Sequence, residues 1–203
     1  MTNYTLLRHG RSAADDENVF EARYDARLTE VGEEQATRLA ARWKTEGRSY
    51  DLVLSSPLKR AARTAEIIAE ALSAPMKTDE RWLEIDAGGL SGLPKDEGLK
   101  RFPKMNDFHG PYDRIAAGTG ESESQVHARA LYAIEALINE EAQSCLVVSH
   151  GAFLNAVVRM AFGIPIPVNR NGSLFRFRDT GYMDLAYGRN NHRWVLLGFA
   201  AGG

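Results

Sequence analysis

The residues best suited to chemistry in this sequence are two arginines and two histidines that follow short apolar runs. Arg8 and His9 end the first run, His150 ends a later one, and Arg60 lies shortly after a third. In an open α/β sheet, ligands bind at the edge where the strands have their carboxyl ends. We therefore expect these four side chains to converge on one anion site. The forked donors of two arginines favour phosphate or carboxylate there.

The apolar runs are predicted to be buried strands, because helical patterns lie between them. These strands are expected at Tyr4–Leu7, Leu52–Leu54 and Leu146–Val148. Four stretches with apolar residues three and four positions apart are predicted to be helices, and they begin after Thr29, at Pro57, at Ser122 and at about Ala152. We expect Ser56 to cap the second helix. The third has the Ser122 and Gln125 pair of a capping box. Parallel strands alternating with helices indicate an α/β fold.

Two other parts of the chain follow different patterns. Three strands joined by polar turns, partly antiparallel, are predicted near the C-terminus at Leu174–Phe177, Met183–Tyr187 and Trp194–Phe199. The last of these is interpreted either as a core strand or as the seam of a dimer. Segment 93–119 fits neither period, and we expect a lid-like excursion over one edge of the sheet, where long loops often bind ligands.

Length and composition limit the classes of protein that fit. The 203 residues are enough for one well-buried domain, and we expect a single domain over residues 1–203. The net charge of -2 shows no broad basic excess for nucleic acid or a membrane surface. The sequence has no apolar run of 18 residues, and its lone cysteine, Cys145, leaves no disulfide pair. The expectation is a soluble, cytoplasmic protein.

Six short blocks of residues suited to catalysis or to tight turns follow one another along the chain. They are Arg8-His9-Gly10, Leu28-Thr29-Glu30, Ser56-Pro57-Leu58-x-Arg60, Leu83-Glu84-Ile85-Asp86, Gly120-Glu121-Ser122 and Ser149-His150-Gly151. In this order they resemble the histidine phosphatase superfamily, the phosphoglycerate-mutase-like proteins with an Arg-His-Gly signature. The resemblance extends from Tyr4 to about Phe177. It implies a three-layer α/β/α sandwich with a mostly parallel central sheet.

The resemblance also implies a catalytic role for five residues. His9 would be the nucleophile and form a phosphohistidine. Arg8, Arg60 and His150 would hold the phosphoryl oxygens while charge develops on them. Glu84 would be the general acid for the leaving oxygen and then the base for water, which requires a raised pKa.

A further group of residues is expected around the substrate. The expected substrate-binding residues, besides Arg8, Arg60 and His150, are Ser12, Asp15, Glu21, Ala22, Gly151 and Ala152. Asp86, two residues beyond Glu84, is the alternative candidate for the general acid. The resemblance implies no metal and no cofactor, because protein groups supply all the donors, and the five histidines show no zinc-like spacing.

Several positions depart from the family pattern, and two of them make the segment after the expected nucleophile more acidic. Asp15 stands where asparagine is usual, Glu21-Ala22 replaces a Gln-Gly pair, Arg27 replaces a proline, and Asn155 replaces an arginine. A carboxylate facing a phosphate repels it unless it is protonated or turned away. Three interpretations stay open. In the first, the leaving group is less anionic than phosphoglycerate or carries a positive charge. In the second, Arg11, Arg23 or Arg27 pairs with the acids. In the third, turnover is poor.

The favoured function is a metal-independent phosphatase that hydrolyses a small phosphorylated metabolite through a phosphohistidine at His9. Phosphoglycerate-mutase-type phosphoryl transfer is the first alternative, although mutases resemble longer chains with more elaborate closing loops. The second alternative is a non-catalytic member that binds a phosphorylated ligand. The expected partner is a small phosphorylated metabolite, with no nucleic acid and no membrane, and a homodimer is possible.

Overall fold

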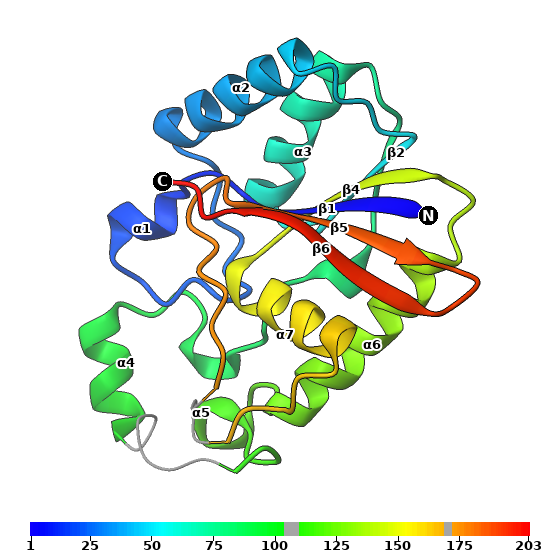
Figure 1. The fold of residues 1–203 in the computed structure, drawn as a ribbon. Coiled ribbons are helices and arrows are strands. Elements are labelled where there is room, and N and C mark those ends of the chain that lie inside the picture. Colours follow the sequence, from blue (N-terminus) through cyan, green and yellow to red (C-terminus); the bar gives the residue numbers. More distant parts are fainter. Residues whose placement is uncertain (104–109, 169–171) are drawn as a thin grey trace.

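The computed structural model describes residues 1–103, 110–168 and 172–203, and a six-stranded sheet lies at its centre (Figure 1). The strands, in the spatial order β3-β2-β4-β1-β5-β6, are β3 (Met76–Thr78), β2 (Leu52–Ser55), β4 (Ser144–Ser149), β1 (Thr2–Arg8), β5 (Tyr182–Gly188) and β6 (Arg193–Ala200). The first four are parallel, whereas β5 and β6 are antiparallel. The predicted mostly parallel sheet is therefore confirmed.

Helices cover both faces of the sheet, which confirms the three-layer α/β/α sandwich (Figure 1). One layer consists of α2 (Glu30–Thr45) and α3 (Lys59–Leu72), and the other of α6 (Glu123–Ile138) and α7 (Gly151–Phe162). In β4, Leu146 and Val148 pack with the first layer, and Val147 packs with the second. Burial on both faces explains why the strands read as continuous apolar runs.

The helix that carries Arg60 begins later than predicted. Its first residue is Lys59, with Leu58 at the N-cap, so neither Ser56 nor Pro57 has the expected place. The amide of Ser56 instead continues the strand pairing by donating to the carbonyl of Val148 at 3.0 Å. The free amide of Lys59 donates to the carboxylate of Asp25 at 2.8 Å. A carboxylate from a distant segment thus stabilises the positive end of α3.

The prediction of a strand at Leu174–Phe177 is wrong, and a side chain provides the reason. The amide side chain of Asn155 donates to the carbonyl of Phe175 at 2.8 Å and accepts from the amide of Phe175 at 2.8 Å. The guanidinium of Arg8 donates to the carbonyl of Phe177 at 3.1 Å. Backbone groups satisfied by side chains need no strand neighbour. The other two C-terminal strands and their antiparallel pairing are confirmed as β5 and β6.

Segment 93–119, expected as an excursion, contains α4 (Lys95–Arg101) and α5 (Ile115–Gly118), and its residues 104–109 lie outside the described part of the chain (Figure 1). The structure also has α1 (Ala13–Glu17) and the short 3-10 helices η1 (Glu80–Trp82) and η2 (Gly88–Leu90), which sequence patterns did not predict. The excursion starts against the segment that follows α1, because the amide of Phe20 donates to the carbonyl of Leu93 at 2.9 Å.

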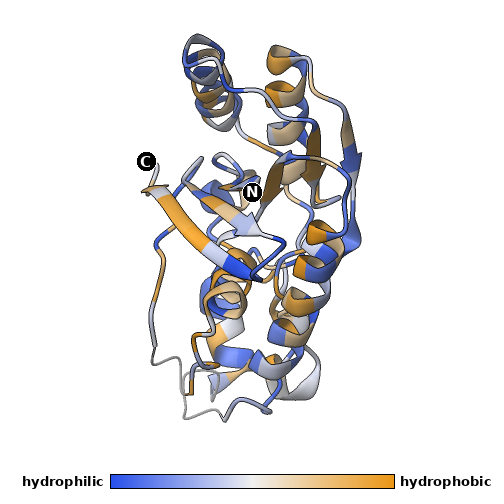
Figure 2. Ribbon diagram, turned by 45° about the vertical axis from the view of Figure 1, so that its right-hand side comes forward, coloured by the Kyte–Doolittle hydropathy of each residue, from blue (hydrophilic) through white to orange (hydrophobic). Residues whose placement is uncertain are grey.

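The edge strand β6 is rich in hydrophobic residues, as the colouring of the ribbon in Figure 2 shows. Val195, Leu196, Leu197 and Phe199 are all exposed. The strand therefore does not contribute these side chains to the core, and the possible homodimer stays a prediction. Within the described residues, no helix is both long and apolar enough to cross a membrane.

Candidate active site

His9 lies directly beyond β1 with a defined proton position. Its ring is buried, and Nδ1 is 2.7 Å from the carbonyl oxygen of Gly10. Because a carbonyl only accepts hydrogen bonds, Nδ1 carries the hydrogen in the neutral ring. The lone pair is then on Nε2, so this nitrogen is the ring atom able to act as a nucleophile.

The loop that holds His9 is fixed between α2 and α3. A Cβ on Gly10 would lie 2.6 Å from the carbonyl oxygen of Gly32, so the two backbones approach too closely for any side chain. The amide of Gly10 donates to the buried hydroxyl of Thr64 at 3.1 Å, and that hydroxyl donates to the carbonyl of Arg60 at 2.8 Å. Thr64 therefore connects the loop of His9 to the helix that carries Arg60.

Arg60 reaches the ring of His9 from the first turn of α3. Its Nη1 and Nη2 donate to the carbonyls of Tyr24 and Ala22, each at 2.7 Å. Its Nε donates to Nε2 of His9 at 3.2 Å. The predicted clamp is thus partly built into the protein, because two of the guanidinium nitrogens hold the segment before α2. Ala22 takes a left-handed backbone conformation, with φ of 41°, to present its carbonyl.

The two histidines face one another at the carboxyl edge of the sheet. Their ring centroids are 5.1 Å apart, and both rings are buried. Burial, reinforced by the positive charge of Arg60, holds the pKa of each imidazole well below its usual value. Both rings are therefore neutral at neutral pH. Nε2 of His150 lies 2.8 Å from Oγ of Ser56, the residue expected to cap α3.

Arg8 connects the site to the C-terminal segment. Besides its bond to Phe177, it forms an ion pair with Asp179, with Nη2 and Oδ1 3.4 Å apart. Its charge contributes to lowering the pKa values of both His9 and His150, after burial and Arg60. Sequence analysis missed Asp179, because no pattern links the tail to the first strand.

Glu84 lies against the N-terminus of α7, the helix that follows His150. Its Oε1 accepts hydrogen bonds from the amides of Ile85 and Phe153, each at 2.9 Å, and Oε2 accepts from the amide of Ala152 at 3.3 Å. Burial of this carboxyl nevertheless raises its pKa. The raised pKa favours a carboxyl group that holds and releases a proton. Arg60 acts on the same carboxyl through its charge, so Glu84 belongs to the same cluster.

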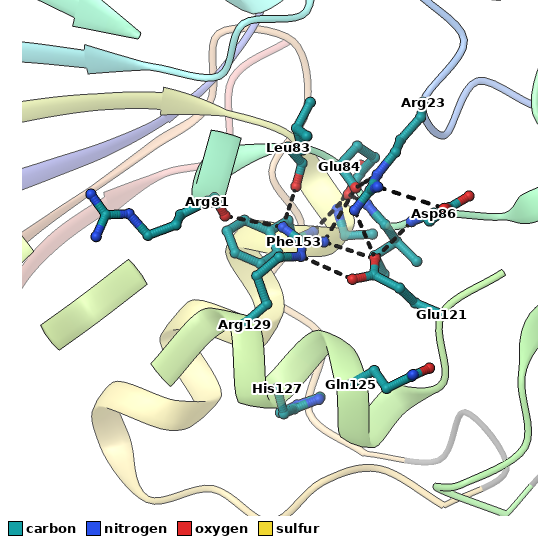
Figure 3. Close-up of polar contacts among 12 residues, drawn as sticks. Arg23, Arg81, Leu83, Glu84, Asp86, Glu121, Gln125, His127, Arg129 and Phe153 are labelled. Carbon is teal, nitrogen blue, oxygen red and sulfur yellow. Dashed lines mark hydrogen bonds and ion pairs between the residues drawn. The ribbon is translucent and has the colours of Figure 1, made fainter. Parts of the chain in front are cut away.

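A network of arginines holds the backbone of Glu84 in place (Figure 3). Arg129 donates to the carbonyls of Leu83 at 2.7 Å and Glu84 at 3.2 Å, and binds both carboxylate oxygens of Glu121 at 2.9 Å. Arg23 donates to the same Glu84 carbonyl at 3.1 Å. The sequence blocks contain Glu121 but did not predict that either arginine holds the backbone of Glu84. Arg23, a candidate partner for the acids of segment 15–21, instead pairs with Asp86 and Glu121.

Asp86, the alternative general acid, has its carboxylate within this network. Its carboxylate forms an ion pair with Arg23, with the atoms 3.5 Å apart, and accepts from the amide of Gly88 at 2.7 Å. Figure 3 shows it beside Arg23 and Glu121. The geometry therefore favours Glu84 over Asp86 for proton transfer.

The acidic residues of segment 15–21 have different partners. The carboxylate of Asp15 accepts from the amide of Ser12 at 3.1 Å and so caps α1 instead of facing an anion. Asp16 forms an ion pair with Arg11 at 2.6 Å. Glu21 instead extends into the site, where it accepts a hydrogen bond from the hydroxyl of Ser12. The expectation that arginines pair with the acids therefore holds for Asp16.

The expected substrate-binding residues Gly151 and Ala152 form the first turn of α7 and line a cavity of about 500 Å³. Ile85, whose amide holds Glu84, lines it as well, together with Asn155 and Arg159. The cavity therefore begins beside the carboxyl expected to protonate a leaving group. No group of three or more metal-ligating His, Cys, Asp or Glu side chains occurs in the described ranges, and a metal-free reaction stays a prediction.

Comparison with known proteins adds an independent finding. Residues 4–199 match the histidine phosphatase superfamily (branch 1). The chain is 36% identical over 167 residues to a 2,3-bisphosphoglycerate-dependent phosphoglycerate mutase of Methylobacterium sp. strain 4-46, covering 78% of this chain and 80% of that protein. It is 31% identical over 163 residues to an uncharacterized phosphatase, PhoE, of Bacillus subtilis strain 168, covering 78% and 76%.

A solved structure agrees over the whole chain. YhfR of Bacillus stearothermophilus superimposes with a TM-score of 0.85 at 25% identity, covering 100% of this chain and 98% of that one. The fold and the named relatives define an α/β enzyme of the phosphatase and mutase kind. The protein belongs to the histidine phosphatase superfamily, in agreement with the ordered sequence blocks.

Proposed function

We propose that the protein is a phosphomonoesterase that hydrolyses a small phosphorylated metabolite through a phosphohistidine at His9, without a metal. The single observation that supports this most is the state of the His9 ring. Its Nδ1 donates to Gly10, so Nε2 keeps its lone pair at the point where Arg60 donates to it. A neutral buried imidazole beside a guanidinium is suited to attack an anionic phosphorus centre.

The first step forms the phosphoenzyme. The lone pair of Nε2 on His9 attacks phosphorus as the bond to the ester oxygen breaks. Glu84 gives its proton to that oxygen, so the leaving group departs as a neutral alcohol. Arg8, Arg60 and His150 donate to the phosphoryl oxygens. The leaving group extends from Glu84 toward the cavity lined by Gly151 and Ala152.

The second step releases phosphate. The carboxylate of Glu84 takes a proton from water as the water oxygen bonds to phosphorus. The bond between phosphorus and Nε2 of His9 breaks, and its electron pair returns to the ring. The backbone bonds from Arg129 and Arg23 keep Glu84 in one place for both proton transfers.

The test uses an aryl phosphate, a chelator and two variants. We expect wild-type protein to release phosphate with the chelator present, and His9→Ala to lose this activity while keeping its circular dichroism spectrum. His192→Ala is the matched control, because this histidine is exposed and bonded to Tyr187 at the far end of β5. Rapid quenching during turnover should trap an acid-labile phosphoryl group on His9. Wild-type activity that disappears with the chelator contradicts the proposal.

A mutase is the second candidate, favoured by the 36% identity to a named phosphoglycerate mutase. The same phosphohistidine would then pass to a second hydroxyl of the substrate instead of to water. The acidic side chain of Glu21 at the site favours hydrolysis over transfer between the anionic phosphoglycerates. Incubation with 3-phosphoglycerate and a trace of 2,3-bisphosphoglycerate distinguishes them, since a mutase forms 2-phosphoglycerate with little free phosphate.

Location and assembly belong to the proposal too. We propose that the enzyme works in the cytoplasm, where a lone buried thiol such as Cys145 stays reduced. We propose that two copies associate through the exposed apolar residues of β6. Sedimentation of wild-type protein and of Leu197→Lys should show a dimer and a monomer, respectively. Cell fractionation tests the location.

A further inference from the structure

An acidic side chain of the protein itself lies where a phosphoryl group would have to bind. Oε1 of Glu21 is 3.1 Å from Nε of the buried Arg60, and it accepts a hydrogen bond from the hydroxyl of Ser12. Oε2 of Glu21 is 3.8 Å from Nε2 of His9. The carboxylate therefore contacts the nucleophilic nitrogen and the guanidinium nitrogen that faces it.

The backbone that carries Glu21 cannot retreat far from this place. The carbonyl of Glu21 accepts from the amide of Tyr24 at 2.7 Å, and Arg60 holds the carbonyls of Ala22 and Tyr24 on either side of that turn. Moving the segment breaks the hydrogen bonds of a buried guanidinium, which is costly. A bound phosphoryl group therefore displaces the side chain by rotation, and the carboxylate stays at the mouth of the site.

The other charges around the site already have partners, so the position of Glu21 affects which substrates bind. Arg8 already has Asp179 as its counterion, and Arg60 has Glu21. The other acids of the segment are engaged elsewhere, Asp15 as the cap of α1, Asp16 with Arg11, and Glu17 with the hydroxyl of Tyr24. A phosphomonoester thus adds its negative charge next to a carboxylate. A second anionic group on the leaving alcohol adds to that repulsion, whereas a cationic group relieves it.

We propose that Glu21 makes the enzyme selective for the charge of its substrate. The preferred substrates are phosphomonoesters whose alcohol carries an ammonium group close to the ester oxygen. The inference rests on the proposed phosphatase function and deepens it. The ammonium group pairs with the displaced carboxylate of Glu21, and esters with a carboxylate in the same place are disfavoured. Glu21 acts on binding and discrimination, and His9 and Glu84 keep their roles in bond making and breaking.

Three phosphomonoesters of two-carbon alcohols test the inference, because they differ in the charge of the group at the alcohol's far end. They are O-phosphoethanolamine, ethyl phosphate and 2-phosphoglycolate, which carry an ammonium, a neutral methyl and a carboxylate. We expect kcat/KM for phosphate release by wild-type protein to fall in that order, by about tenfold per step, as a single close charge pair produces. Glu21→Gln should remove most of the difference between the first and the last substrate.

Two variants distinguish the effect of a negative charge anywhere in this segment from the effect of the local contact that Glu21 makes. Glu21→Gln keeps the side chain's shape and its acceptor for Ser12. Asp16→Asn removes the same charge from the same segment, but this side chain is largely exposed and paired with Arg11, so we expect the substrate order to stay that of wild type. Inhibition by inorganic phosphate gives a second measurement, and Glu21→Gln should lower the inhibition constant by about tenfold because an internal competitor is gone.

The outcomes distinguish a failure of the proposed phosphatase function from a failure of the inference about Glu21. If wild-type protein cleaves neither these esters nor an aryl phosphate, the proposed phosphatase function itself is wrong. If it cleaves the aryl phosphate but has the same substrate order as Glu21→Gln, Glu21 does not set specificity and the inference is overturned. An equal loss of activity of Glu21→Gln on all three substrates, with the order kept, overturns it as well.

Discussion

Replacing Glu84 by glutamine should remove proton donation while leaving the fold nearly unchanged. Both backbone amides that donate to Oε1, those of Ile85 and Phe153, can donate to the amide oxygen of glutamine in the same place. The new NH2 group then faces the amide of Ala152, which is 3.3 Å from Oε2 in the wild-type protein. This donor-to-donor contact should lower the free energy of unfolding by about 1 kcal/mol.

The effect on catalysis should depend on the leaving group. A positioned general acid contributes about 10²- to 10⁴-fold, or roughly 2.7 to 5.4 kcal/mol of barrier. We expect Glu84→Gln to lower kcat/KM by that amount for an alkyl phosphate, whose leaving oxygen needs a proton. For 4-nitrophenyl phosphate, whose phenolate leaves without one, the loss should be much smaller. The value of kcat/KM is used because it reports the phosphorylation step, before Glu84 acts on water.

The pH profile gives an independent test of the same residue. The proposed mechanism requires a neutral His9 and a protonated Glu84, whose pKa values are lowered and raised, respectively, mainly by burial. For the alkyl phosphate, kcat/KM should fall as the pH rises through the raised pKa of Glu84, and Glu84→Gln should lose this alkaline limb. Equal losses on both substrates with the limb retained would show that Glu84 has only a structural role.

Three further substitutions probe the support of the site. Arg129→Met leaves Glu121 without its main partner and should lower the free energy of unfolding in urea by about 3 to 5 kcal/mol. The pKa of Glu121 is lowered, because its hydrogen bonds to Arg129 and to the amide of Asp86 outweigh the effect of burial. In wild-type protein, the stabilisation by this ion pair is therefore lost as the pH falls through that lowered pKa. Thr64→Val removes the acceptor for Gly10 and should cost about 1 to 3 kcal/mol in thermal denaturation. Ala22→Gly should stabilise the protein by about 1 kcal/mol, because alanine has a left-handed conformation there.

These three expectations have a common control in Arg38→Met, an exposed arginine of α2 that pairs with Glu34. Its effect on unfolding should stay within about 0.5 kcal/mol. An effect of Arg129→Met as small as this would contradict the assigned network. Destabilisation by Ala22→Gly would mean that the left-handed turn carries no strain.

Sequence patterns predicted what depends on period and order. The apolar runs gave β1, β2 and β4, and the capping box at Ser122 marked the start of α6. Sequence patterns could not show which hydrogen-bond partner a polar group takes when two partners are within reach. Ser56 has the right type to cap α3, but its hydroxyl pairs with His150 and its amide continues the sheet. In the same way, Asn155 supplies the hydrogen bonds that a neighbouring strand would otherwise make.

The site itself could be predicted only in part, because its order along the sequence is informative and its internal contacts are not. Arg8, His9, Arg60 and His150 are brought to one edge by the strands that precede them. That Asp15 turns to the amide of Ser12 depends on α1, a five-residue helix too short to leave a periodic signal.

One physical cause connects the titrations of the site. Burial favours the neutral form of every group that can lose its charge, so it lowers the pKa values of His9 and His150 and raises that of Glu84. The two arginines cannot lose theirs, and they supply the positive charge. A site built this way keeps His9 unprotonated and lets Glu84 hold a proton over the same pH range. It therefore needs an anion to balance Arg60, and in the free enzyme that anion is the carboxylate of Glu21.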